Sequence, residues 1–154
     1  MQHLIQLRSI FGFLILGLFL LPFTAVIANE PYNGHTDFEK YSVYYNIFDS
    51  TTVPADVAAI YGIKRSKYEN LINVSISHKG KYGALKGTVR GTITNLMQQQ
   101  RILDFMEIQE QDATYYIAPI RISGKDTVHI ALEIVPSGEN TILPVKFTKI
   151  LYSE

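Results

Sequence analysis

The chain has 154 residues, in which 14 Lys and Arg residues balance 14 Asp and Glu residues, and it contains no cysteine. This neutral charge argues against a nucleic-acid-binding protein, because such domains are usually strongly basic. The absence of cysteine excludes disulfides, thiol nucleophiles and cysteine-ligated metals. The domain must therefore be stabilised by its hydrophobic core alone, which a chain of this length permits.

The first 28 residues have the pattern of a secretory signal peptide. Arg8 is followed by residues 10–21, all apolar or glycine, and then by small residues that end at Ala28. This order predicts export, with cleavage after Ala28 and one mature domain over residues 29–154. The alternative is an uncleaved inner-membrane anchor, since residues 9–28 carry no charge and a bilayer span needs roughly 20 residues.

A leader and a first strand are predicted next. Residues 29–36 are rich in turn formers and are expected to form a loose leader. Between residues 37 and 48, apolar and polar side chains alternate, which predicts a half-buried strand.

One short helix is predicted between Thr51 and Gly62. Thr51 and Thr52 can cap its start, and Pro54 suits its first turn. Gly62 fits a C-terminal stop. The helix should turn one apolar stripe toward the sheet, formed by Val57, Ile60 and Tyr61.

The rest of the chain alternates like a series of strands joined by short turns. Six further strands are predicted, over residues 70–78, 85–94, 101–109, 114–122, 128–134 and 141–152. The pattern favours an all-β, immunoglobulin-like antiparallel β-sandwich of about seven strands, with one short helix inserted after the first strand. Because the chain lacks the Cys and Trp residues of antibody domains, this likeness concerns architecture alone.

No motif in the sequence predicts a catalytic residue, a cofactor or a metal site. His35, His78 and His129 are scattered, and without cysteines they make a poor ligand set. A triad could be drawn from Ser66, either of the last two histidines and Asp56. No serine lies in a Gly-x-Ser-x-Gly turn, however, so the pattern does not favour acyl transfer.

Two surface patterns leave alternatives open. Seven basic residues lie between Lys64 and Arg90, and an acidic stretch covers residues 104–112. These charges can pair across strands, or the basic ones can form a face for an anionic ligand. In each pair of adjacent tyrosines, such as Tyr44 and Tyr45, one side chain must point outward, where tyrosine suits either a strand or a protein interface.

The candidate interaction surface therefore consists of Tyr61, Arg65, Ser66 and Tyr44. Arg65 could form charge-assisted hydrogen bonds to a carboxylate or phosphate, with Tyr61 and Ser66 beside it. In the alternative interpretation, Arg65 and Ser66 only cap the helix and fix the loop that follows.

The chain resembles a domain-of-unknown-function family of small exported proteins of Gram-negative bacteria. The resemblance covers the mature chain and is most specific in the segment Pro54-x-x-Val57-Ala58-x-x-Tyr61-Gly62-Ile63-x-Arg65-Ser66-Lys67. It is also carried by the segments Tyr41–Thr51, Leu71–Ser75, Gly91–Leu96 and Phe105–Ile108. It implies a periplasmic location and a single β-rich domain, and it carries no activity.

Together these observations favour a non-catalytic periplasmic module that binds an envelope protein or an anionic ligand. Nucleic acid is not an expected partner, and a membrane is expected only through an uncleaved first segment. Two alternatives are a small hydrolase-like enzyme of the cell envelope and a sandwich that binds lipid or glycan through its tyrosines.

Overall fold

The structure is a computed structural model that describes residues 34–81, 83–111 and 113–153. The predicted signal peptide and its cleavage site lie outside these residues, so both remain predictions. Within the described ranges, no helix is long and apolar enough to cross a membrane.

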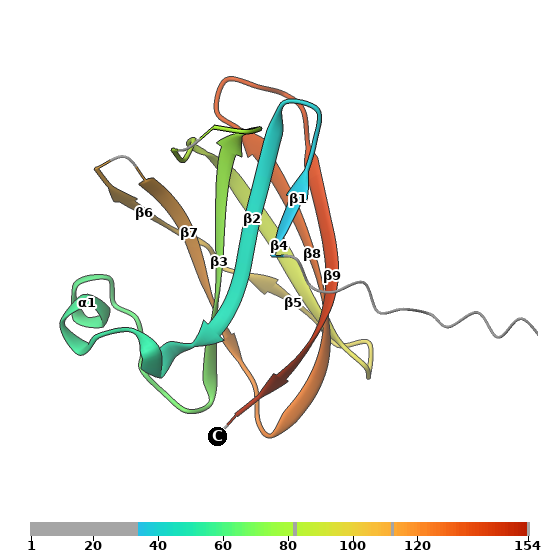
Figure 1. The fold of residues 1–154 in the computed structure, drawn as a ribbon. Coiled ribbons are helices and arrows are strands. Elements are labelled where there is room, and N and C mark those ends of the chain that lie inside the picture. The colour runs from blue at the N-terminus through green and yellow to red at the C-terminus, as the bar shows by residue number, and fades with distance from the viewer. Residues whose placement is uncertain (1–33, 82, 112, 154) are drawn as a thin grey trace, which may run out of the picture. The chain divides into compact units, whose positions relative to one another are not determined.

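Two antiparallel sheets pack face to face (Figure 1). The five-stranded sheet has the order β1-β2-β3-β7-β6, and the four-stranded sheet has the order β5-β4-β8-β9. The strands are β1 His35–Asp37, β2 Tyr41–Asp49, β3 Glu69–His78, β4 Gly87–Asn95, β5 Gln100–Leu103, β6 Met106–Glu110, β7 Ala113–Arg121, β8 Lys125–Pro136 and β9 Leu143–Tyr152. The predicted all-β sandwich is confirmed.

The described residues form nine strands where about seven were predicted. His35 and Thr36 were expected in a loose leader, but they belong to β1, in which His35 pairs with Tyr44 of β2. The segment predicted as one strand over residues 101–109 divides into β5 and β6, which lie in different sheets. That division explains why the segment is apolar on both faces: Leu103 enters the main core, whereas Ile108 is buried outside it.

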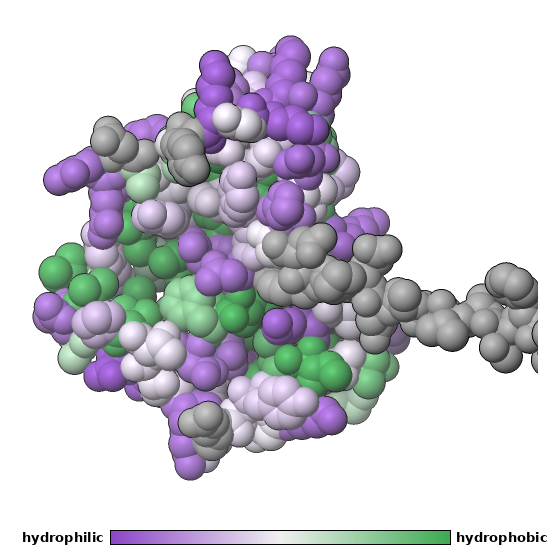
Figure 2. Space-filling view, in the orientation of Figure 1, coloured by the Kyte–Doolittle hydropathy of each residue, from purple (hydrophilic) through white to green (hydrophobic). Residues whose placement is uncertain are grey.

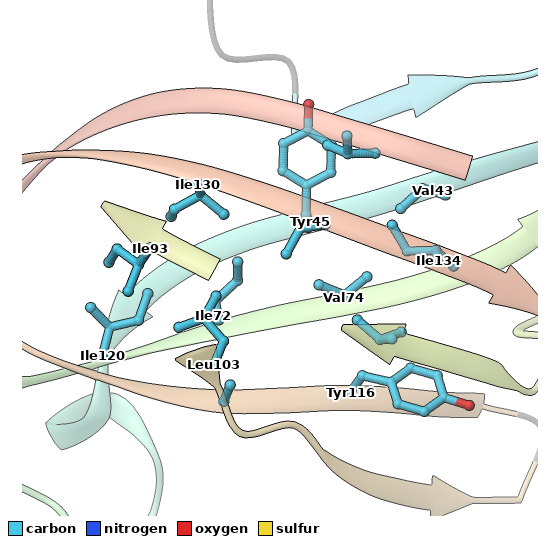
Figure 3. Packing of buried hydrophobic residues seen from close by; sticks show 14 of the residues in the cluster. Val43, Tyr45, Ile72, Val74, Ile93, Leu103, Tyr116, Ile120, Ile130 and Ile134 are labelled. Atoms are coloured by element: carbon cyan, nitrogen blue, oxygen red, sulfur yellow. The ribbon is translucent and has the colours of Figure 1, made fainter. Parts of the chain in front are cut away.

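The main core lies between the sheets and is built from alternate residues of their strands (Figure 3). Val43, Ile72 and Val74 of the five-stranded sheet and Ile130 and Ile134 of the four-stranded sheet are each at most 2% exposed. Complete burial of such a side chain stabilises the fold by about 1.5–3 kcal/mol. This core fixes which side chains of β2, β3 and β7 must point to the opposite, outer face.

The connection between β2 and β3 contains η1, a 3-10 helix over Ser50–Thr52, and then α1 over Ala55–Ile60. The predicted threonine caps are wrong: Pro54 holds the N-cap position, and the Thr52 hydroxyl donates to the Asp49 carbonyl instead. Thr52 lies in a separate turn that ends before α1 begins, so its hydroxyl bonds to the preceding carbonyl. Gly62 is confirmed as the stop, with φ of 65° and the Ile63 N–H bonded to the Ala58 carbonyl.

The predicted apolar stripe of α1 is only partly right. Ala58 is the buried residue at 3% exposed, Val57 and Tyr61 are half-buried, and Ile60 is 75% exposed. Successive helical residues lie about 100° apart, so a face centred between Ala58 and Tyr61 turns Ile60 outward. In Figure 2, apolar side chains accordingly gather around α1, while the upper end of this view is hydrophilic.

Candidate functional site

The loop that follows α1 is tied back to η1 by two of the predicted site residues. Arg65 Nη2 donates to the Thr51 carbonyl at 2.9 Å. The Ser66 N–H donates to Ser50 Oγ at 2.9 Å, and that hydroxyl donates back to the Ser66 carbonyl at 3.1 Å. Because Ser50 is fully buried, this pair of bonds anchors the loop. These contacts fit the interpretation in which Arg65 and Ser66 fix the loop.

Tyr61 joins α1 to the end of β6. Its hydroxyl donates to Glu110 Oε1 at 3.3 Å. Partial burial, and then the nearby Glu110 carboxylate, raise the pKa of Tyr61 above its ordinary value. The contact holds the Glu110 side chain on the outer face of the five-stranded sheet.

Tyr44, the fourth predicted site residue, lies on that same outer face. It is 46% exposed, whereas its neighbours Val43 and Tyr45 point into the core. Its ring stacks on that of His35, with centroids 5.7 Å apart and planes at 25°. Its cross-strand partner on β3 is Ser75.

The pairing between β3 and β7 ends halfway along β3. The last pair is Val74 with Tyr116, although both strands continue beyond it. In Figure 1, β7 and β6 swing away from the upper part of β3. If the register continued, Tyr115 would stand opposite Ser75, so this small residue lies between two tyrosine positions.

A groove opens where these strands diverge. Its volume is about 990 Å³, and its floor and walls come from β2, β3, the end of β6, β7, and the β3–β4 and β6–β7 connections. The residues that line it are Tyr44, Ser75, Ile76, Ser77, Lys81, Gly83, Ala84, Glu110, Gln111, Ala113 and Tyr115. Small side chains in the middle and larger ones at the sides therefore hollow this face.

The floor of the groove contains a hydroxyl that no described group satisfies. Ser77 is 6% exposed, and within the described ranges its Oγ has no hydrogen-bond partner. Its cross-strand neighbour Ser42 is also buried, but the Ser42 hydroxyl donates to Asp37 Oδ1 at 2.6 Å. Buried polar groups are normally paired, so this hydroxyl lacks a partner that a bound ligand could supply. Because the oxygen itself is buried, the ligand reaches it only when the side chains that cover it move aside.

The structure does not assemble the triad that could be drawn from the sequence. Ser66 precedes β3 and His78 ends it, so about nine residues of extended chain, roughly 30 Å, separate them. His129 lies in β8 of the other sheet, with its Nδ1 2.8 Å from Thr148 Oγ1. Among the residues described, no group of three or more His, Asp or Glu side chains could hold a metal ion.

The fold and the groove define a two-sheet β-sandwich protein with an open groove on one outer face. The chain belongs to the family described as Domain of unknown function (DUF4426), which matches residues 35–154. The predicted resemblance to a family of unknown function is thus confirmed.

Solved structures share this fold. A DUF4426 family protein from Pseudomonas aeruginosa PAO1 has a TM-score of 0.71 and 28% identity, over 80% of this chain and 98% of that one. FetP of uropathogenic E. coli strain F11 has a TM-score of 0.57 and 12% identity, over 78% and 93% of the two chains. A copper-bound FetP variant has a TM-score of 0.54 and 11% identity, over 78% and 90%. No curated protein matches the chain.

The sequence reasoning found part of the groove and missed its floor. Tyr44 lines the groove, and Tyr61 contacts it through Glu110. Ser75 and Ser77 were missed, because small polar residues on an outer strand face are ordinary. A signal was present in the central strand, where Asn73, Ser75 and Ser77 alternate with buried residues.

Proposed function

We propose that the protein is an exported, non-catalytic binding module of the cell envelope that takes its ligand in the outer-face groove. The observation that carries this proposal is the buried Ser77 hydroxyl, which has no partner in the described part of the chain and lies in the floor of a groove of about 990 Å³. Ligand sites are concave and contain a few well-placed polar groups.

The predicted interaction surface is thereby divided by role. Tyr44 is a wall of the groove, and Tyr61 positions Glu110 at its rim. Arg65 and Ser66 fix the loop that follows α1, and this loop begins directly after Tyr61. A ligand with anionic groups could use Lys81, which lies at the rim and is exposed.

A periplasmic location is supported by the predicted signal peptide. The similar protein FetP was expressed recombinantly in the periplasm, and one of its variants was solved with copper. At 11–12% identity this likeness concerns the fold, so no copper site is proposed for this chain.

The experiment searches for a natural ligand. Its control is a variant in which a large side chain fills the groove. Protein expressed from the full chain is titrated with small-molecule fractions of a bacterial envelope extract, and its NMR resonances are followed. We expect one fraction to shift the resonances of Tyr44, Ser75 and Tyr115. Ser75→Phe should abolish these shifts, whereas Thr88→Phe, which introduces the same side chain at an exposed position of β4, should preserve them.

Two results would contradict the proposal. One is that no fraction shifts the groove resonances; the other is that Ser75→Phe responds like the unmodified protein. Melting curves of both variants establish that each is folded. If Ser75→Phe is unfolded, Tyr44→Ala replaces it as the variant expected to lose the response.

A further inference from the structure

We infer that the ligand of this groove is a carbohydrate chain, with one sugar ring held between Tyr44 and Tyr115. The inference rests on the proposed function and names its ligand class. Tyr44 and the Tyr115 position lie one strand to either side of Ser75, so the backbones that carry the two walls are about 10 Å or more apart. A ring that packs at about 3.5–4 Å from each wall fits such a slot.

The Tyr44 wall is fixed before any ligand arrives. Its ring is stacked on His35, so one face is held by β1 while nearly half of the residue remains exposed. A wall that is already ordered reduces the side-chain entropy lost on binding. The C–H groups on the faces of a sugar ring pack against aromatic rings, which have an apolar body and a polar tip.

The polar groups of the groove suit the hydroxyls around the edge of such a ring. Each serine hydroxyl can donate one hydrogen bond and accept two, so the half-buried Ser75 can bind a sugar hydroxyl directly. Ser77 can do so where the side chains that cover its oxygen move aside. At the rim, Lys81 offers donors, Glu110 offers acceptors and Gln111 offers both. An aliphatic ligand would cover the half-buried Ser75 hydroxyl without offering it a hydrogen bond, which is unfavourable.

The geometry fits a polypeptide ligand less well. Strand addition needs an accessible strand edge. Thr114, which lies two residues beyond the last paired residue of β7, is only 4% exposed. The carbonyl of Ile76, its partner in a continued register, already accepts from the Leu85 N–H at 2.7 Å. Apart from the tyrosines, the exposed lining is small or polar, so it lacks the deep apolar pocket that a peptide anchor fills.

The test uses sugar oligomers with two tyrosine variants. The full chain is titrated with the trisaccharide of N-acetylglucosamine and with maltotriose, followed by NMR and calorimetry. We expect at least one of them to bind saturably and to shift Tyr44, Ser75 and Ser77. Tyr44→Ala should weaken that binding by about tenfold or more, as for removal of an aromatic anchor. Tyr68→Ala removes a tyrosine of similar exposure, at 40% against 46%, outside the groove, and should change it less than about twofold.

The outcomes separate this inference from the proposed function. If an envelope fraction shifts the groove resonances and no sugar does, the carbohydrate inference is wrong while the binding function stands. If a tyrosine-containing peptide shifts them and no sugar does, the groove is a peptide site. If neither fraction nor sugar acts on the groove, both proposals fail. Equal losses of sugar affinity in Tyr44→Ala and Tyr68→Ala would also overturn the inference that Tyr44 packs against a sugar ring.

Discussion

The outer faces of the two sheets are both rich in polar side chains, yet they differ in how those side chains are satisfied. On the four-stranded sheet, His129 bonds to Thr148 and Gln100 Nε2 donates to Thr94 Oγ1, around a hollow of about 390 Å³. On the five-stranded sheet, the larger groove has a buried hydroxyl without a described partner.

The difference shows that polar composition alone does not create a candidate site. The four-stranded sheet stays paired: β4 and β8 match over nine residues, and β8 and β9 over ten. The five-stranded sheet loses the pairing of β3 with β7 after six residues. Divergence next to small residues leaves a hollow that neighbouring side chains do not fill.

The largest expected effect comes from adding a side chain at Gly87 of β4, which lies close to β3 of the other sheet and to β8 of its own sheet. A Cβ on Gly87 would lie 2.6 Å from both Ile76 Cδ1 and the Val135 carbonyl oxygen. Because the oxygen belongs to the backbone, Gly87→Val should lower the free energy of unfolding by about 3 kcal/mol or more. Equilibrium denaturation measures this loss.

A matched change in the same strand controls that result. A Cβ on Gly91 would meet the end of the Leu132 side chain at 2.7 Å, and such an end can move aside. Gly91→Ala should therefore destabilise the protein less than Gly87→Ala. Equal losses would mean that the β8 backbone moves away from a side chain at position 87. The spacing between β4 and β8 would then not be fixed at this point.

The next effect concerns the anchor behind the groove rim. Ser50→Ala removes the hydroxyl that binds both the N–H and the carbonyl of Ser66. The Ser66 N–H then loses this partner inside the protein, whereas the carbonyl still accepts from the Glu69 N–H at 3.0 Å. We expect a loss of about 2 kcal/mol in the free energy of unfolding. Arg65→Ala breaks one exposed bond to Thr51 and should lose less than about 1 kcal/mol. The reverse order, or a selective loss of ligand binding in Arg65→Ala without a loss of stability, would favour a direct binding role for Arg65.

A smaller effect on stability is expected at high pH, through Tyr61 and Glu110 at the groove rim. The pKa of Tyr61 is raised by partial burial and by Glu110, so the folded state holds this proton more tightly than the unfolded chain. The associated stability is fully present below a pH of about 10, the ordinary tyrosine pKa, and is lost as pH rises through the folded-state value. In tyrosinate absorbance titrations, Glu110→Gln should lower the pKa of one tyrosine. Identical titrations would show that this carboxylate does not act on Tyr61.

The sequence was sufficient to predict the layers of this fold, because residue alternation reports burial directly. The period of two in β2, β3 and β8 predicted which side chains form the core, and Gly62 marked the end of α1. The boundary between β5 and β6 inside residues 101–109 was missed. The apolar residues of the two short strands alternate out of step with each other, so the whole segment looks like one strand with two apolar faces.

The groove could not be predicted in the same way. Its walls, Tyr44 and Tyr115, come together only through the registers of β2 with β3 and of β3 with β7. Neither register follows from local pattern, and nothing in the sequence says that the second one ends at Val74. The predicted site residue Arg65 was conspicuous because it had no apparent role in folding, and its bond to Thr51 now supplies one.

The most direct measurement of the central claim compares two neighbouring serines. Ser42 and Ser77 are cross-strand partners and are both buried, but the Ser42 hydroxyl bonds to Asp37, whereas the Ser77 hydroxyl has no partner among the described residues. We predict that Ser42→Ala lowers the free energy of unfolding by about 1 kcal/mol, whereas Ser77→Ala leaves it unchanged or raises it. Equal losses in the two variants would show that Ser77 is already satisfied within the protein, and the groove would lose the feature that marks it as a binding site.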